Sequence, residues 1–149
     1  MVDFIPEAIQ RVHPTRIVFG DGAVKQVGKA VREFGRRPLV VIGGGFARRT
    51  GALDKVTASL KEAGLNWAVH EGVNTDPTVD DVVKIVRAIR DGLHDAVVAL
   101  GGGSVIDASK IAARDVRNRP LISIPTTSGS GSEVTRYSFL VDSEKQRTK

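Results

Sequence analysis

Short apolar runs alternate with amphipathic segments along most of the chain. The runs are continuously apolar, which predicts buried strands, whereas the segments repeat their apolar residues at helical spacing. Glycine or proline stands at most of the junctions, as expected where an element ends. Strands are expected at 15–20, 38–42, 65–70, 95–100 and 120–124, and helices at 23–34, at 53–63, from 76–78 onward and after 101–104. The stretch 134–141 alternates less clearly and is the candidate for a last strand.

The regular alternation of strands and helices predicts the fold class. It is typical of an α/β protein with a doubly wound, mostly parallel sheet and helices on both faces, a Rossmann-like arrangement. Residues 1–149 are expected to form a single domain, with 1–14 and 142–149 peripheral. The helix that opens at 76–78 is expected to bury Val79, Val82, Val83, Val86 and Ile89.

Several loops of unusual composition follow the predicted strands. They span 43–45, 71–78, 101–104 and 125–133, and they are rich in glycine, proline or hydroxyl residues. Right-handed crossovers place all strand-to-helix loops at one edge of a parallel sheet. Ligands of such folds bind there, outside the carboxyl ends of the strands. The shared position therefore predicts a crevice for a phosphate-bearing ligand.

The stretch 101–104 carries three glycines and a serine between a strand and a helix. Without Cβ atoms the turn can bring its N–H groups against a ligand, and the helix N-terminus favours an anion. Ser104 is placed to cap the helix or to donate to a phosphate. Taken alone, the stretch is equally compatible with a plain turn. The loop after the last buried strand adds five hydroxyls, which belong to Thr126, Thr127, Ser128, Ser130 and Ser132.

Composition narrows the function classes. The chain has 149 residues, a net charge of +5 and no cysteine, which excludes disulfides and thiolate chemistry. The basic residues are scattered and aromatic content is 5%, so no nucleic-acid partner is expected. No apolar run reaches membrane-spanning length, and the N-terminus lacks the features of a signal peptide, so we expect a cytoplasmic protein with no membrane partner.

No set of side chains predicts a catalytic centre or a metal site in this chain. No nucleophile, base and acid are grouped as a triad. Asp107 is as compatible with a first-turn acid favoured by the helix dipole as with a ligand contact. Lys110 is expected at the surface or paired with Asp107, and Glu133 is either a buried partner of loop N–H groups or exposed. The isolated histidines, expected to be structural or exposed, are His13, His70 and His94.

Two long motifs carry a resemblance to a known family. Residues 101–110 read GGGSVIDASK and residues 125–135 read PTTSGSGSEVT, and in this order they resemble the iron-containing (group III) alcohol dehydrogenases. The resemblance runs from about residue 15 to the end and covers only the N-terminal, dinucleotide-binding domain. It implies hydride transfer between an NAD(P) cofactor and a small alcohol or aldehyde. The family holds iron or zinc in a C-terminal helical domain that this chain lacks, so the chain alone is expected to be inactive.

The same resemblance assigns roles to individual residues. Gly102, Gly103 and Ser104 match residues that cradle the cofactor pyrophosphate, and Asp107 matches an aspartate near the nicotinamide and substrate. Asp76 aligns with a position near the adenosine that is often asparagine. The remaining matches to cofactor contacts are Thr126, Thr127, Thr135 and Lys149.

Cofactor preference is expected to follow from the loop after the second predicted strand. NAD-preferring members carry an aspartate there, which meets the ribose 2′-hydroxyl. Here the position is Gly43, Gly44 and Gly45, followed by Arg48 and Arg49. An arginine can pair with a 2′-phosphate, which an aspartate would repel. We therefore expect NADP(H) to be preferred to NAD(H).

Other interpretations stay open at this point. The short link 110–120 resembles that of the glycerol and glycerol-1-phosphate dehydrogenase relatives. The chain is also compatible with a stand-alone, non-catalytic nucleotide-binding module. A lyase or synthase resembling dehydroquinate synthase shares the fold, but Ser104 and the loop that ends at Glu133 argue against it. An apolar face left by a missing helical domain would favour a homodimer.

Overall fold

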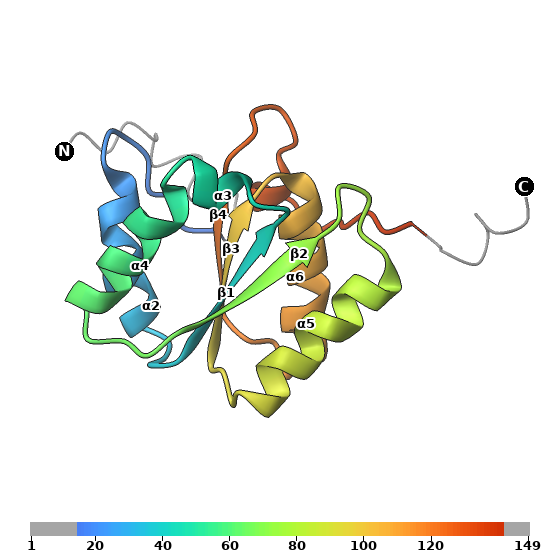
Figure 1. The fold of residues 1–149 in the computed structure, drawn as a ribbon, viewed down its shortest axis with the longest axis horizontal. Coiled ribbons are helices and arrows are strands. Elements are labelled where there is room, and N and C mark those ends of the chain that lie inside the picture. The colour runs from blue at the N-terminus through green and yellow to red at the C-terminus, as the bar shows by residue number, and fades with distance from the viewer. Residues whose placement is uncertain (1–14, 142–149) are drawn as a thin grey trace, which may run out of the picture.

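A computed structural model describes residues 15–141 of the chain. Its centre is a sheet of four parallel strands (Figure 1), namely β1 (Pro38–Gly43), β2 (Ala68–Val73), β3 (Ala96–Gly101) and β4 (Leu121–Pro125). Their order across the sheet is β2-β1-β3-β4. The chain moves outward from β1 to β2 and then returns to the other side of β1. The direction of winding therefore reverses between β1 and β3, which is where ligands bind in open parallel sheets.

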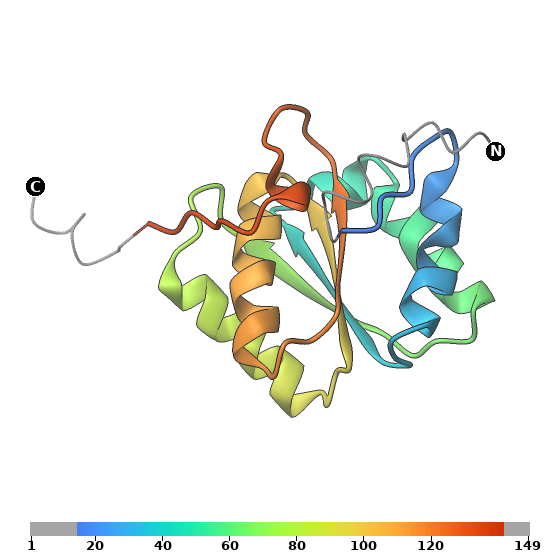
Figure 2. The ribbon, with the colours of Figure 1, turned by 180° about the vertical axis from the view of Figure 1, so that it is seen from behind.

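Helices cover both faces of this sheet (Figures 1 and 2), as the sequence predicted. A 3₁₀ turn (Ala23–Gln26), α2 (Val27–Arg32), the short α3 (Phe46–Arg49) and α4 (Ala52–Glu62) precede β2. The helices α5 (Val79–Asp91) and α6 (Gly103–Asp115) lie on the opposite face from α2 and α4, and a 3₁₀ turn (Ser132–Val134) follows β4. The doubly wound parallel architecture is confirmed.

Two hydrophobic clusters fill the space between the helices and the sheet. Alternate residues of β1 belong to different clusters. Leu39 and Val41 pack towards α5 and α6, whereas Val40 and Ile42 pack towards α2 and α4. All of them are buried. Burial on both faces explains why the strand reads as a continuous apolar run instead of an alternating one.

The expected first and last strands are wrong. Residues 15–20 run alongside the fold without pairing to the sheet among the described residues, and Phe19 is 71% exposed. Arg16 ties this stretch to Glu33 by an ion pair of 2.8 Å. Residues 134–141 form no ladder beyond a single bridge between Thr78 and Val141. Thr135, Tyr137 and Phe139 of this segment bond to side chains of α6 instead of to a strand.

One strand boundary and the buried face of one helix also differ from expectation. β2 begins at Ala68 and not at residue 65, because Leu39 of β1 pairs with Ala68. The Leu65 N–H instead donates back to Leu60 of α4 at 3.1 Å. On α5, Val79 is 54% and Val83 is 39% exposed, so neither belongs to the buried stripe. The other predicted core residues of this helix are buried, and Ile85 joins them.

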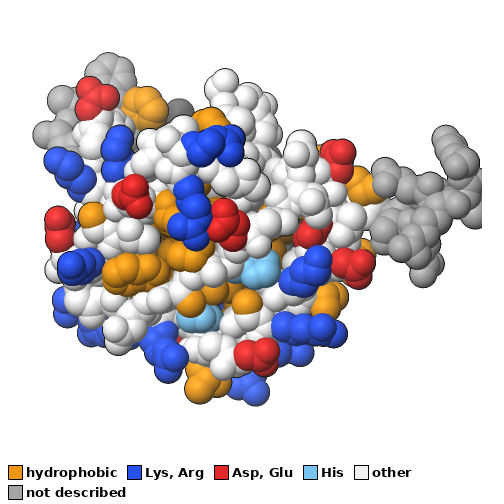
Figure 3. Space-filling view, viewed as in Figure 1, with side chains coloured by type: hydrophobic (Ala, Val, Ile, Leu, Met, Phe, Trp, Pro, Cys, Tyr) orange, Lys and Arg blue, Asp and Glu red, His pale blue; other side chains and the backbone are white. Residues whose placement is uncertain are grey.

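The surface has no single charged region on the face shown in Figure 3. Lys and Arg side chains are spread over it with Asp and Glu between them. No helix within residues 15–141 is long and apolar enough to cross a membrane.

Candidate functional site

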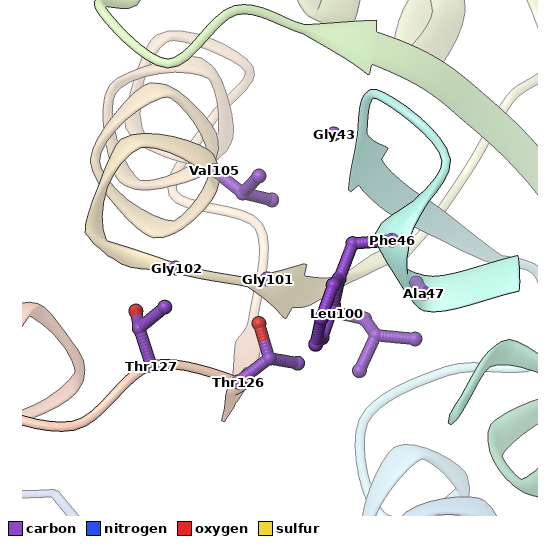
Figure 4. A pocket seen from close by; sticks show the side chains of 9 residues that line it. All are labelled: Gly43, Phe46, Ala47, Leu100, Gly101, Gly102, Val105, Thr126 and Thr127. Atoms are coloured by element: carbon purple, nitrogen blue, oxygen red, sulfur yellow. The ribbon is translucent and has the colours of Figure 1, made fainter. Parts of the chain in front are cut away.

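A cavity of about 180 Å³, open to solvent on one side, lies at the carboxyl ends of β1, β3 and β4. Figure 4 shows the ring of Phe46 beside Leu100 on one side and the side chains of Thr126 and Thr127 on another. Its walls are largely apolar and belong to Gly43, Phe46, Ala47, Leu100, Gly101, Gly102, Val105, Thr126 and Thr127. We call this the first cavity. It lies at the reversal point between β1 and β3.

A second cavity of about 580 Å³ lies on the other side of the N-terminus of α6. Three segments line it: the loop 75–77, the first turns of α6, and the segment 130–141 that follows β4. Polar side chains, including Asp76, Ser104, Asp107 and Thr135, contribute to its walls. The two cavities therefore flank one helix end.

The N-terminus of α6 is closely packed and lacks a side-chain cap. A Cβ atom on Gly102 would lie 2.8 Å from the hydroxyl oxygen of Thr127, and one on Gly103 would lie 3.1 Å from Ser130 Cβ. We call the loop 125–133 the hydroxyl loop. Its close approach to the helix favours glycine at both positions. Among the described residues the N-cap, Gly102, provides no side-chain bond to the first-turn N–H groups, so these donors and the positive end of the helix dipole are available to an anion.

Ser104 does not cap this helix, contrary to the prediction that offered capping as one of its roles. Gly102 holds the cap position, and the Ser104 hydroxyl donates to the carbonyl oxygen of Thr75. This contact joins the start of α6 to the loop before α5. It explains how loops that are far apart in sequence share one cavity.

The loop 74–78 is held by a buried carboxylate on α5. Asp81 is 2% exposed and accepts from the Thr78 N–H at 2.9 Å and from the Asn74 amide at 3.1 Å. Its own N–H donates to the Thr78 hydroxyl, which completes a capping box. Burial raises the pKa of Asp81, but the bonds from Thr78 and Asn74 outweigh this effect and hold the pKa below its ordinary value.

Asp107 is buried at the rim of the second cavity. Its Oδ1 lies 2.9 Å from the Lys110 ammonium, and its Oδ2 accepts from the Phe139 N–H at 3.1 Å. The side chain of Lys110 is only 14% exposed, so the pairing with Asp107 is confirmed and the surface alternative is wrong. Glu133 is partly buried, and its Oε2 is buried without a hydrogen-bond partner among the described residues, so it does not serve the loop N–H groups through that oxygen.

The histidines of the described chain lie apart from the two cavities. His94 is 5% exposed and its Nδ1 lies 3.0 Å from the carbonyl oxygen of Arg37, a structural position. His70 is partly buried on β2, and burial, with help from the Lys84 cation, lowers its pKa. His13 lies outside the described residues. Within residues 15–141, no group of three or more His, Cys, Asp or Glu side chains is placed to hold a metal ion.

The three glycines 43–45 at the end of β1 lie in different surroundings. Gly43 lines the first cavity, whereas Gly44 and Gly45 line neither cavity. Gly45 adopts φ = 86° as the cap of α3, a backbone conformation that favours glycine. Arg48 is not free, because its Nε lies 2.7 Å from Glu71 at the end of β2.

Most of the predicted site residues are brought together. The residues that line one or other cavity are Gly43, Asp76, Gly102, Gly103, Ser104, Asp107, Thr126, Thr127 and Thr135. Lys149 lies outside the described residues. Sequence reasoning missed Phe46 and Val105 in the first cavity and Tyr137 and Phe139 in the second. Phe46 could have been noticed as an aromatic residue directly after a glycine triplet, whereas the others carry no comparable signal.

Comparisons with known proteins agree with this geometry. The family model for iron-containing alcohol dehydrogenase matches residues 14–149. NADH-dependent butanol dehydrogenase A of Clostridium acetobutylicum is 33% identical over 88% of this chain, and NADPH-dependent butanol dehydrogenase of Clostridium saccharobutylicum is 35% identical over 87%. In each case the match covers 38% of the relative.

A crystal structure shows the same fold. The iron-containing alcohol dehydrogenase of Thermotoga maritima superposes with a TM-score of 0.79 and 34% identity, over 89% of this chain and 42% of that one. The chain thus spans about two fifths of the length of the relatives that it matches. On the family match, the shared motifs and the shared fold, the chain belongs to the iron-containing alcohol dehydrogenase family.

Proposed function

We propose that this chain binds a nicotinamide dinucleotide with its pyrophosphate on the N-terminus of α6. The observation that carries the proposal is the pair of cavities on either side of that helix end, at the point where the winding of the sheet reverses. A dinucleotide has a nucleoside on each side of a diphosphate, so it matches this arrangement. The first-turn N–H groups are the donors for the phosphates.

The residues present fit such a cofactor. Gly102 and Gly103 bring the hydroxyl loop against the start of α6, because a Cβ atom at either position would meet Thr127 or Ser130. Thr126 and Thr127 present hydroxyls to the first cavity, and Ser104, Asp107, Asp76 and Thr135 face the second. When bound, the cofactor supplies hydride transfer at its nicotinamide ring. The chain's own residues bind and orient it.

We further propose that NADP(H) binds more tightly than NAD(H). Support comes from Arg48 and Arg49, which follow the glycine triplet, and from the lack of an acidic residue in the loop 43–45. Named relatives include both an NADH-dependent and an NADPH-dependent butanol dehydrogenase. Arg48 would exchange part of its contact with Glu71 for a 2′-phosphate.

We propose that the whole protein is an alcohol dehydrogenase of the iron-containing type and that it acts on a small alcohol or aldehyde. The described residues do not fit a metal ion, so no part of the proposal for this chain depends on one. The chain by itself is therefore expected to bind cofactor without oxidising alcohols.

Titration of the purified chain with NADPH and NADH tests the proposal. Calorimetry, or fluorescence transfer from Trp67 to the reduced nicotinamide, reports binding. The variant Gly103→Val places a side chain where the hydroxyl loop packs, and it should abolish binding. The matched control Ala58→Val, at an exposed position of α4, should bind normally. Absence of binding by the parent chain would refute the proposed function, and equal affinities would refute the NADP(H) preference.

A further inference from the structure

The segment 132–139 begins at the end of the hydroxyl loop and lines one side of the second cavity. After the 3₁₀ turn it has no ladder of its own, and Figure 2 shows it passing beside the start of α6. Its backbone carbonyls are therefore left to water or to side chains of other elements, and three of them accept from Lys110.

The ammonium of Lys110 donates hydrogen bonds to these carbonyls. Its Nζ lies 3.0 Å from Ser132 O and 3.3 Å from Thr135 O, and it also donates to Tyr137 O. An ammonium has three N–H donors that point in different directions, whereas an aliphatic side chain has none. One side chain thus connects three carbonyls of an irregular segment to the helix.

Asp107 extends the same attachment. It balances the charge of Lys110 at 2.9 Å and accepts from the Phe139 N–H at 3.1 Å with its other oxygen. The two side chains are 7% and 14% exposed, so the pair is shielded from solvent. A shielded charge pair that also satisfies backbone groups is costly to break from one side only.

We propose that Lys110 is the positioning residue of the dinucleotide site, holding the segment 132–139 in place as a wall of the second cavity before the cofactor arrives. The effect of this role on cofactor binding rests on the proposed function. Without Lys110 the wall must be ordered at the moment of binding, and affinity falls by the cost of that ordering. Lys110 itself lines neither cavity, so it acts through the wall and not by contact.

The variants Lys110→Met and Lys110→Gln test this role in the full chain. Amide hydrogen exchange should show faster exchange at residues 134–139 in Lys110→Met, and NADPH affinity should fall about tenfold, with the loss in the entropy of binding. Lys110→Gln retains N–H donors and should lie between Lys110→Met and the parent. Exchange that is faster at 134–139 but unchanged in β1 and β3 distinguishes this local loss from a general loss of stability.

The control is Arg114→Met, which removes an exposed cation from the same helix and should change neither measurement. Unchanged exchange at 134–139 in Lys110→Met would overturn the positioning role, and so would faster exchange with unchanged NADPH affinity. If the parent chain itself fails to bind NADPH, the proposed function fails, whereas the exchange data still decide whether Lys110 holds the segment.

Discussion

Replacing Asp81 by asparagine tests how the loop beside the second cavity is held. The substitution keeps the size of the side chain but removes its charge. Asp81 accepts from the Thr78 N–H at 2.9 Å, from the Thr78 hydroxyl at 3.1 Å and from the Asn74 amide at 3.1 Å and 3.2 Å. An asparagine at this position would offer one acceptor oxygen and would turn an N–H₂ group towards Asn74.

The expected cost follows from these contacts. A hydrogen bond to a charged group contributes about 1 kcal/mol more than a bond between neutral groups. Loss of a negative charge in the first turn of α5 costs roughly a further 0.5 kcal/mol. We therefore expect Asp81→Asn to lower the free energy of unfolding at pH 7 by about 1–2 kcal/mol.

The sign of the pH dependence is also determined. The pKa of Asp81 in the folded chain lies below its ordinary value of 3.8. Folding therefore favours the charged form, and the contribution is complete at pH values well above 3.8. It is lost as the pH falls below 3.8 and through the lowered pKa. The stability difference between the parent and Asp81→Asn should shrink over that range.

Urea unfolding at pH 7, at pH 5 and at several lower values measures this difference. Asp80→Asn is the matched control, because Asp80 is an exposed acid in the same turn of α5. Asp80→Asn should lower the free energy of unfolding by roughly 0.5 kcal/mol, the size of an interaction with the helix dipole. An Asp81→Asn effect no larger than that of Asp80→Asn, or one that persists undiminished in acid, would refute the reasoning.

Three further predictions concern the helices and the edge strand. Ser59→Ala should destabilise the chain by about 2 kcal/mol, because the buried hydroxyl accepts from Gly28 N–H at 3.0 Å and donates to Lys25 O at 2.7 Å. Gly28→Ala should cost about 3 kcal/mol, since its Cβ would lie 2.1 Å from Ser59 O. His70→Gln should flatten the pH dependence of stability below 6.5, because the lowered pKa of His70 makes the parent lose stability as the ring becomes charged. Urea unfolding measures all three, and a proton NMR titration follows the His70 ring.

The Ser59 and His70 predictions each have a control variant. Thr57→Ala removes a hydroxyl from the same helix as Ser59, where it bonds only within its own turn at 3.2 Å, and should change stability by less than about 0.5 kcal/mol. Equal effects of Thr57→Ala and Ser59→Ala would contradict the first prediction, and a tolerated Gly28→Ala would contradict the second. Lys84→Gln should raise the pKa of His70, and a pH profile unaltered by His70→Gln would contradict the third.

The architecture could be predicted from the sequence because the two central strands, β1 and β3, are buried on both faces and read as continuous apolar runs. For the run ending at Gly101 and the helix after it, the residue propensities, the glycine turn and the burial all indicate the same structure. For the stretch 15–20, only the residue propensities indicate a strand. Its apolar residues suit a strand, but a strand needs a hydrogen-bonded neighbour, and Phe19 lies exposed without one among the described residues.

The candidate site could be located but not detailed in the same way. Topology alone brings the loops after β1, β3 and β4 to one edge, so Gly43, Gly102 and Thr126 were predictable. The roles of Ser104 and Lys110 depend on what the loops do after leaving the sheet. No local pattern specifies that Ser104 reaches Thr75 or that Lys110 gathers backbone carbonyls, because both partners are irregular segments distant in sequence.

The chain contains two consecutive strand–helix–strand units, 38–73 and 96–125, whose strands pair where Pro38 to Ile42 lie against Ala96 to Leu100. Each unit is local in sequence, but each contributes only part of the wall around the first cavity. The site therefore comes into existence when the two units assemble, a non-local and slow event in folding. A ligand bound there would stabilise the assembled chain and neither unit alone. A chain cut between Asp91 and Ala96 would regain binding only when its two pieces reassociate.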